Sequence, residues 1–226
     1  MAETMPQPYT SPQDFTVLGE RVSKIDLKTI IAEKMAAQDS DELARIEQKF
    51  GPREGKYDYQ AEQRTVQIFN EGGIFESVAL APRTTDVRDH VDFFVQLHNG
   101  TIIAIDYTET ADPNEYNEKV QMVLQKNGKP LETIPELGII PRLVISSEKG
   151  ALNQPQENLS SSDISAGKRP LPNPHKLVQG WFDQIEKQLT WLEKNRPEYR
   201  QLYIGTRRGL KFGRHAYFER VRKQAA

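Results

Sequence analysis

VDFFVQLHNGTIIAIDYTET, residues 91–110, is the stretch that decides the fold. It contains two apolar runs on either side of Asn99-Gly100, and each run carries one aspartate, Asp92 in the first and Asp106 in the second. Valine, isoleucine and phenylalanine favour strands, and Asn-Gly between two such runs is a strong short-range signal for a hairpin. The stretch therefore predicts a β-hairpin with one acidic side chain in each arm.

The register of this hairpin decides where the two aspartates point, because side chains alternate between the two faces of a strand. If Asn99-Gly100 alone form the turn, Phe93 lies opposite Asp106 and a carboxylate enters an apolar face. If residues 98–100 form a three-residue loop with a left-handed glycine, Asp92 lies directly across from Asp106. The second register leaves one face of the hairpin wholly apolar and collects both aspartates on the other.

Two aspartates that face one another across a hairpin need a cation or a shared proton. Opposed residues have Cβ atoms about 4.5 to 5.5 Å apart, and two carboxylates at that distance repel one another. A divalent metal ion is the simplest remedy, so we expect any chemistry of this chain at Asp92 and Asp106. The plainer alternative is that both side chains lie near strand ends in water, since perturbed carboxylates mark functional sites only in part of the cases.

Composition bounds the class of protein. The chain has 226 residues, enough for one substantial core, and 27% of them are charged, as in a soluble globular domain. No apolar run approaches the roughly 18 to 20 residues of a membrane span, and the N-terminus lacks the order of a signal peptide, so we expect a cytoplasmic protein with no membrane contact. Cysteine is absent, which excludes disulfides, thiolate zinc sites and cysteine nucleophiles. A catalytic metal would have to be bound by oxygen atoms.

Basic residues gather at the C-terminal end. From Arg196 onward the net charge is +7, so the preceding 195 residues carry −9. The basic segment also contains Phe212 and Tyr217, and cations interleaved with aromatic rings suit phosphate contact and base stacking. We therefore expect nucleic acid as the partner, with DNA before RNA, although a segment that docks on its own protein is the alternative. The four candidate contact residues are Arg207, Arg208, Lys211 and Arg214.

The periodicity of apolar residues predicts an α/β fold with a mixed sheet. Between Ile25 and Phe50 the spacing predicts one broken helix or two short ones, with Asp39 or Ser40 as a cap. Thr65–Phe69 is compatible with a strand or with the end of a helix. Further elements are a strand over 74–80, the central hairpin, a helix that opens at Asp112-Pro113, a strand over 139–146 and an amphipathic helix over 177–192.

The chain divides into four segments by composition. Residues 1–24 hold three prolines and predict an extended or disordered arm, and residues 25–147 form the α/β core. Residues 148–174 are rich in serine and proline and predict a flexible insert or linker. Residues 175–226 are then an appendage, consisting of the amphipathic helix and the basic C-terminal segment.

The order of these elements, with Asp92 on one strand and Asp106-Tyr107-Thr108 on the next, resembles the PD-(D/E)xK nuclease-like superfamily. The resemblance covers about residues 25–147 and rests on a short, degenerate motif. It implies a restriction-endonuclease-like mixed central sheet flanked by helices. It also implies that Asp92, Asp106 and the carbonyl of Tyr107 bind Mg²⁺ or Mn²⁺. Thr108 stands where the family has its lysine, so this chain lacks the charge that assists catalysis at that position.

The resemblance also suggests where the missing groups could come from. Some members supply the lysine from a neighbouring element, and Lys119 and Lys126 on the helix after the hairpin are the candidates nearest in sequence. Glu33 in the first helix could supply a further acid, as that helix does in parts of the family. His90, two residues before Asp92, would share its face on a strand and could join the metal or act as a base. For each of these residues a solvated surface position is the alternative.

The expected function is that of a metal-dependent phosphodiesterase, which cleaves nucleic acid by metal-activated water. The alternatives are a catalytically inactive nuclease-fold protein that binds nucleic acid or a protein partner, and a structural or assembly protein. Oligomeric state stays open, with a homodimer or a protein partner compatible with the sequence. An NTPase is excluded because the chain has no GxxxxGK[ST] loop, and a serine or cysteine hydrolase lacks its GxSxG elbow or its cysteine.

Overall fold

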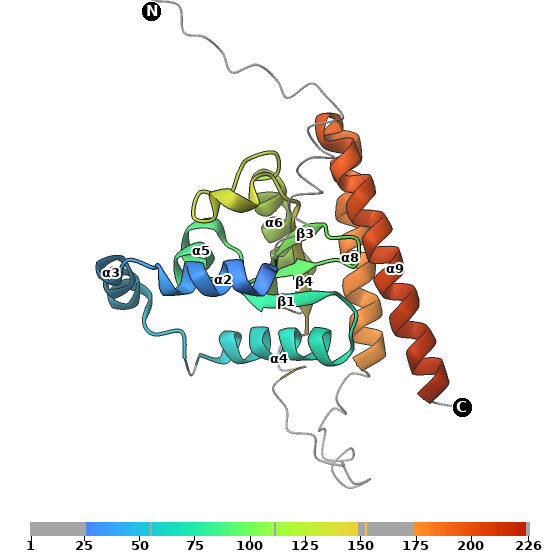
Figure 1. The fold of residues 1–226 in the computed structure, drawn as a ribbon, viewed down its shortest axis with the longest axis horizontal. Coiled ribbons are helices and arrows are strands. Elements are labelled where there is room, and N and C mark those ends of the chain that lie inside the picture. The colour runs from blue at the N-terminus through green and yellow to red at the C-terminus, as the bar shows by residue number, and fades with distance from the viewer. Residues whose placement is uncertain (1–25, 55, 111, 149–151, 153–173, 225–226) are drawn as a thin grey trace, which may run out of the picture.

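The computed structural model describes residues 26–54, 56–110, 112–148, 152 and 174–224. A four-stranded mixed sheet lies between helices on its two faces (Figure 1). The strands follow one another across the sheet in the order β1 (Ser77–Leu80), β2 (Phe93–Gln96), β3 (Ile102–Glu109) and β4 (Arg142–Ser147). The first three are antiparallel neighbours, whereas β4 is parallel to β3. The predicted α/β class with a mixed sheet is confirmed.

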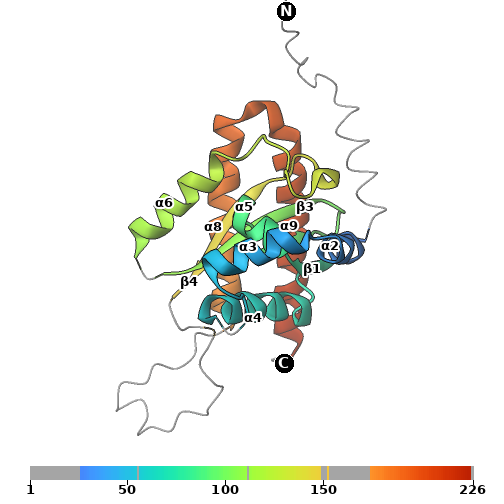
Figure 2. The same cartoon turned by 90° about the vertical axis from the view of Figure 1, so that its left-hand side faces the viewer.

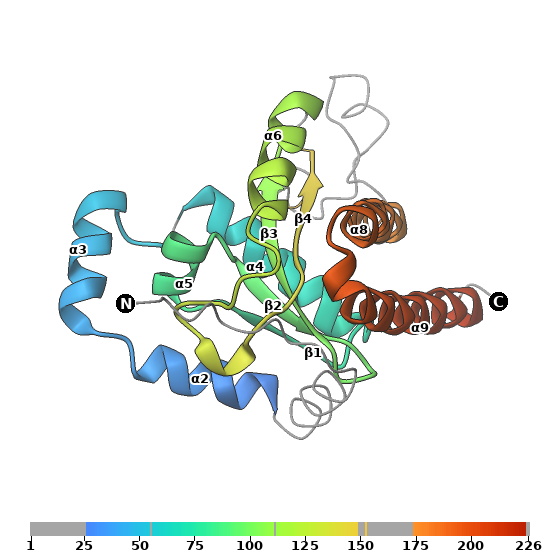
Figure 3. The ribbon, with the colours of Figure 1, turned by 90° about the horizontal axis from the view of Figure 1, so that it is seen from above.

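Two groups of helices lie on opposite sides of this sheet. Figures 2 and 3 show α2, α3 and α5 on one side and the pair α8 and α9 on the other. The helices are α2 (Leu27–Ala36), α3 (Ser40–Phe50), α4 (Tyr57–Glu71), α5 (Arg83–Asp89), α6 (Pro113–Leu124), α8 (Pro174–Asn195) and α9 (Arg200–Gln224), with short 3₁₀ turns η1 (Pro135–Leu137) and η2 (Pro197–Tyr199). Within the described part of the chain no helix is both long and apolar enough to span a membrane.

The hairpin β2–β3 adopts the register with the three-residue loop. Phe93 pairs with Ile105, and the ladder closes at Leu97, whose N–H donates to the carbonyl oxygen of Thr101 at 2.8 Å. Gly100 has φ +82°, the left-handed conformation that this loop requires. The two-residue turn is therefore excluded, and the carboxyl groups of Asp92 and Asp106 lie within hydrogen-bond distance of one another.

Each face of the sheet packs against its own core. Phe93, Val95, Ile103 and Ile105 belong to the larger core, which includes residues of α4, α6, α8 and α9. The opposite face contributes residues such as Phe94 to a smaller core with α2 and the segment 131–140. Asp106 points to this second face, because side chains alternate along β3 and Ala104, two residues before it, belongs to the smaller core.

The helix boundaries follow local capping. Asp39 accepts hydrogen bonds from the backbone N–H groups of Asp41 and Glu42 and begins α3, and Asp112 caps α6 in the same way. Two helices thus occupy the region predicted as one broken helix or two. Residues 65–69 belong to α4, because Ala61, Thr65 and Phe69 recur every fourth residue and face the sheet. The short helix α5 was not predicted.

The C-terminal helices are part of the core, which corrects the prediction of an appendage. Trp181 and Leu189 of α8 and Tyr203 of α9 are each at most 2% exposed. The indole N–H of Trp181 donates to the carbonyl oxygen of Ser146 in β4 at 3.1 Å, so α8 is tied directly to the sheet. The predicted arm over 1–24 lies outside the described residues, as does the predicted linker over 148–174 apart from Glu148, Leu152 and Pro174.

Glycines on α9 allow this helix to approach the rest of the protein closely. Gly205, Gly209 and Gly213 recur every fourth residue and so share one face of the helix. A Cβ atom at Gly209 would lie 2.9 Å from the Cβ of Leu97, and one at Gly213 would overlap the carbonyl oxygen of Ile74. Because that oxygen belongs to the backbone, a side chain at Gly213 requires the helix to move.

We expect Gly213→Ala to destabilise the protein by about 1–3 kcal/mol, the usual cost of overpacking. Gly180→Ala on α8 is the matched control, since a Cβ there has no neighbour within 4 Å. This control should gain about 0.5–1 kcal/mol from the higher helix propensity of alanine. Urea unfolding of both variants checks the pair, and equal stability of the two would contradict the close docking of α9.

Candidate active site

Asp92 and Asp106 lie side by side at the end of the hairpin. Asp92 directly precedes β2, and its N–H donates to the carbonyl oxygen of Ile105 at 2.8 Å. Because Ile105 is already the partner of Phe93, the regular pairing ends at Phe93 and Asp92 lies at a bulge-like irregularity. Its Oδ2 accepts the backbone N–H of Tyr107 at 2.6 Å. Asp92 is 7% exposed and Asp106 is 3% exposed. The two carboxyl groups therefore share a buried site rather than lying at solvated strand ends.

Burial and mutual repulsion disfavour the charged forms of these acids. Burial raises the pKa of Asp92 well above its ordinary value, and the charges of Glu62 and Asp106 raise it further. Burial also raises the pKa of Asp106, although the nearby ammonium group of Lys119 opposes the shift. A site with more negative than positive groups attracts cations.

Lys119 brings the positive charge that Thr108 does not supply. Its Nζ lies 2.6 Å from Oδ1 of Asp106 and donates to the carbonyl oxygen of Tyr107 at 3.0 Å. Burial alone would lower the pKa of Lys119, but the charges of Asp106 and Asp92 outweigh it and raise the pKa. Helix α6 thus carries a lysine to the position next to the aspartates, whereas Thr108 is half-buried and pairs with Ser146 of β4.

A third buried acid, Glu62 of α4, lies near the two aspartates. Glu62 is buried, and its charge is the largest charge effect on the pKa of Asp92. Burial raises the pKa of Glu62 itself, with Arg53 opposing the shift. Glu33, the predicted acid, is exposed on α2. The sequence offered one signal for Glu62. This glutamate is adjacent to Ala61 and three residues before Thr65, both of which are buried on the face of α4 that packs on the sheet.

Arg53 anchors this acid to the hairpin. Its Nη2 donates to Glu62 Oε2 at 2.7 Å and lies 3.4 Å from the carbonyl oxygen of Asp92. Its Nη1 donates to the carbonyl oxygen of Ala81 at 2.8 Å, and its guanidinium group stacks on the ring of Tyr59. The arginine therefore ties α4, β1 and the start of β2 together at the site, and sequence analysis did not single it out.

His90 and Lys126 lie near the acids without contacting them. His90 ends α5 in the left-handed conformation with φ 54°, so it does not share a strand face with Asp92 as predicted. Burial and the charge of Lys126 lower the pKa of His90, while Asp106 opposes the shift. The Nζ of Lys126 donates to the carbonyl oxygen of Asp89 at 3.3 Å. The ring of His90 and the ammonium group of Lys126 thus border the acidic site on one side.

The basic helix α9 lies at the other end of the hairpin. The side-chain amide of Asn99 donates to the carbonyl oxygen of Gly205 at 2.9 Å, which fixes α9 beside the turn. From Thr101 to Asp106 the strand rises about 17 Å. A nucleic acid held by α9 would therefore need to reach along the hairpin to meet Asp106.

The four predicted nucleic-acid contacts differ in their surroundings. Arg207 forms ion pairs with Glu186 at 2.6 Å and Glu193 at 2.7 Å, both on α8, so it serves helix packing. Arg214 lies 3.7 Å from Asp183. Arg208 and Lys211 are exposed on the outer face of α9, next to Phe212, which is 61% exposed. Of the predicted set, Arg208 and Lys211 remain the side chains best available for phosphate.

The donor atoms of the site suit a hard divalent cation. Oδ2 of Asp106 is buried and receives no hydrogen bond from a donor group among the described residues, which is costly unless a cation or a proton shared with the carboxyl group of Asp92 satisfies it. Carboxylate and carbonyl oxygens are the ligands that Mg²⁺ prefers. In the described part of the chain no three acidic or histidine side chains form a metal cage on their own. A metal ion at this site would have Asp92, Asp106 and the Tyr107 carbonyl as its available protein ligands, with water completing the coordination as is usual for Mg²⁺.

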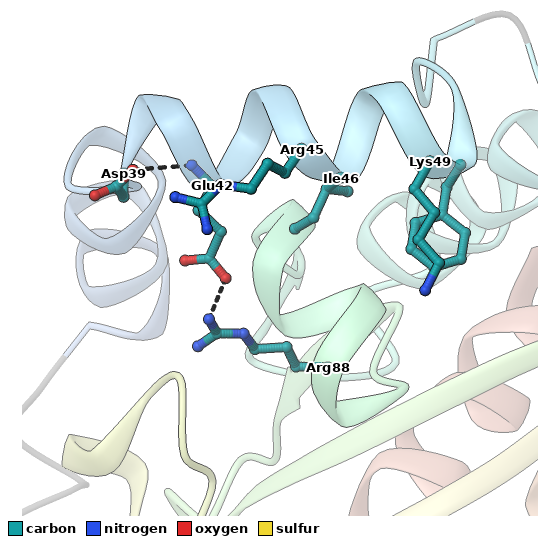
Figure 4. A pocket seen from close by; sticks show the side chains of 7 residues that line it. Asp39, Glu42, Arg45, Ile46, Lys49 and Arg88 are labelled. Carbon is teal, nitrogen blue, oxygen red and sulfur yellow. Dashed lines mark hydrogen bonds and ion pairs between the residues drawn. The ribbon is translucent and has the colours of Figure 1, made fainter.

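A separate hollow on the surface lies between α3 and α5, away from these acids (Figure 4). Glu42 and Arg88 form an ion pair across it, and Asp39 is engaged in capping α3. None of the predicted site residues lines this hollow. Its charged groups of both signs give no indication of a particular ligand.

Comparison of the chain with protein-family models, curated proteins and solved structures found no significant match. The site must therefore be interpreted from its own geometry.

Proposed function

We propose that this protein is a metal-dependent phosphodiesterase acting on nucleic acid, with its active site at Asp92 and Asp106. The single observation that carries the proposal is the position of Lys119, whose Nζ lies 2.6 Å from Asp106 Oδ1. The lysine expected two residues after the second acid is supplied by α6. A buried pair of acids, a backbone carbonyl and a lysine at one point form the set of groups that phosphodiester hydrolysis needs.

The order of elements supports a restriction-endonuclease-like fold for this protein. Helix α4 is followed by the antiparallel strands β1, β2 and β3, then by α6 and by β4 parallel to β3. The short helix α5 between β1 and β2 is an addition to this order. The order agrees with the family that the motif of Asp92 and Asp106 resembles. Fold alone does not imply activity, so the site residues carry the functional argument.

The proposed roles follow from the contacts. Asp92, Asp106 and the carbonyl of Tyr107 would hold Mg²⁺ or Mn²⁺, which acts as a Lewis acid on a phosphoryl oxygen and makes water a better nucleophile. Lys119 carries a positive charge at the edge of the site, where it can neutralise charge that develops on the phosphate. Glu62, held by Arg53 at 2.7 Å, adds negative charge that favours cation binding.

The test is a cleavage assay of the full chain on single- and double-stranded DNA and RNA. We expect cleavage with Mg²⁺ or Mn²⁺ and none after chelation. Lys119→Arg is a useful companion variant, because it keeps the charge but changes the geometry at Asp106 and should cut slowly. Failure of the clean wild-type protein to cut any of the four substrates with either metal would reject the enzyme proposal.

A second candidate is a catalytically inactive protein of the same fold that binds nucleic acid. The observation that favours it is again at Lys119, which already satisfies Asp106 Oδ1 and the Tyr107 carbonyl without a metal. In that case the ion pair is structural and stabilises the end of the hairpin. Binding of nucleic acid without turnover distinguishes this candidate from the first.

Nucleic-acid binding is expected to depend on the outer face of α9. Replacing Arg208 and Lys211 together by alanine should remove two phosphate contacts and lower the slope of log affinity against log salt by about 2. Lys28 and Lys49, exposed on α2 and α3, provide the matched double-alanine control. Fluorescence anisotropy with labelled DNA at several salt concentrations measures both variants. If the affinities of the wild type and the α9 variant depend equally on salt concentration, these α9 residues do not contact the nucleic acid.

A further inference from the structure

Lys119 contacts the same oxygen atoms that a metal ion would use. Its Nζ is 2.6 Å from Asp106 Oδ1 and 3.0 Å from the carbonyl oxygen of Tyr107. Both atoms belong to the set that would hold Mg²⁺ in the proposed function. Of that set, Asp106 Oδ2 alone is known to be buried without a hydrogen-bond partner among the described residues.

An ammonium group and a divalent ion cannot occupy this position together. Mg²⁺ binds oxygen at 2.0–2.1 Å, so an ion on Asp106 Oδ1 and the Tyr107 carbonyl would lie almost against the present position of Nζ. Like charges at such a separation repel strongly in a poorly hydrated site. Metal entry therefore requires the lysine to leave at least one of the two oxygens.

The side chain of Lys119 is able to leave. It is 27% exposed, whereas that of Asp106 is 4% exposed, so the lysine reaches the acids from the solvent side. Four methylene groups let the ammonium group swing outward without a change in helix α6. The carboxylates, in contrast, are held in place by the hairpin.

On the basis of the proposed function, we infer that Lys119 is the resident counter-cation of the carboxylate pair and competes directly with the divalent metal. Lys119 keeps the acids neutralised while no metal is present, and metal binding releases its ammonium group toward solvent. The lysine thereby lowers the affinity for metal, while the proposed reaction still depends on its charge. Removing it should tighten metal binding and abolish cleavage at the same time.

The test measures Mn²⁺ binding by electron paramagnetic resonance, without any nucleic acid. Lys119→Met should bind Mn²⁺ at least about tenfold more tightly than wild type, since one direct competitor is lost. Lys126→Met is the matched control, because it removes an equal charge nearby that contacts the Asp89 carbonyl and not the carboxylates. It should change the affinity by less than about threefold. Adding Asp106→Asn to Lys119→Met should abolish the tight site.

A second measurement uses the wild-type protein and so does not depend on how well a variant folds. The amine of Lys119 should react faster with an acetylating reagent when Mg²⁺ is present, as peptide mass spectrometry can follow. Unchanged or weaker Mn²⁺ binding by Lys119→Met, or protection of the amine by Mg²⁺, overturns the inference. If Lys119→Met binds Mn²⁺ more tightly but the wild-type protein cleaves no substrate, the competition between lysine and metal is supported and only the nuclease proposal is rejected.

Discussion

Replacement of Asp106 by asparagine is expected to lower the rate of Mg²⁺-dependent cleavage by at least about 10³-fold, because several kcal/mol of transition-state stabilisation depend on the metal. Asp106 has the contacts most relevant to metal binding. Its Oδ1 forms the ion pair with Lys119, and its buried Oδ2 receives no hydrogen bond from a donor group in the described structure. An amide keeps the shape but loses the charge that binds a cation. Initial rates on the best wild-type substrate give the factor.

The control for this variant is Asp41→Asn, which removes a carboxylate exposed on α3. It should cleave at the wild-type rate. Circular dichroism and thermal unfolding must show that the Asp106→Asn protein is folded, since its Lys119 is left without the ion pair. Cleavage that survives in a folded Asp106→Asn protein would place the active site elsewhere.

Replacement of Asp92 by asparagine is expected to abolish cleavage and yet stabilise the protein at pH 7 by about 1–3 kcal/mol, because an amide is not repelled by the neighbouring acids and costs less to bury than a carboxylate. Asp92 is buried, and its charged form is opposed by Glu62 and Asp106. The asparagine oxygen can still accept the N–H of Tyr107, which Oδ2 now accepts at 2.6 Å. The variant therefore loses repulsion and keeps the hydrogen bond.

The dependence of stability on pH gives the sign of this effect. Because the pKa of Asp92 is raised above 3.8 in the folded state, the folded protein retains a proton that the unfolded chain has lost. The contribution of Asp92 to the free energy of unfolding is therefore fully present at low pH. It falls as pH rises from about 4 through the pKa of Asp92 in the folded protein. Urea unfolding over this pH range should show a smaller decline for Asp92→Asn than for wild type.

Asp89→Asn is the matched control for this comparison. Asp89 is also buried, but it lies 3.7 Å from the guanidinium group of Arg142 and accepts a hydrogen bond from Thr133. Removing its charge deprives the buried guanidinium group of Arg142 of this ion pair and leaves it the hydrogen bond to the carbonyl oxygen of Pro130, so this variant should lose stability. If both asparagine variants lose stability to the same extent, Asp92 is not under electrostatic strain.

Part of the site could be predicted from residues 91–110 alone. Period-two alternation and Asn99-Gly100 predicted the hairpin, and an apolar face free of carboxylates favoured the register that the structure adopts. The regular pairing ends at Phe93, and Asp92 directly before it lies with its carboxyl group next to that of Asp106. Local rules sufficed here because strand pairing and turn geometry involve only neighbours along the chain.

Other parts depended on contacts between distant segments. The sequence placed Lys119 before Lys126 as the substitute lysine, and the resemblance indicated Glu33. Glu62 was not a candidate, because the sequence does not tell which helix packs at the end of the hairpin. The structure distinguishes them by the distances of Lys119 to Asp106 and of Arg53 to Glu62. Such choices follow from packing angles, which no short window of sequence encodes.

The same limit applies to the basic C-terminal segment. Its charge was evident from composition, but Arg207 proved to be paired with Glu186 and Glu193 of α8, and the glycines of α9 fit it against the hairpin turn. The sequence by itself determined the hairpin with its two aspartates, the α/β class and the positive charge of the C-terminal segment. Only the tertiary structure decided which lysine and which glutamate join the aspartates, because burial and ion pairing depend on segments that meet solely in the folded chain.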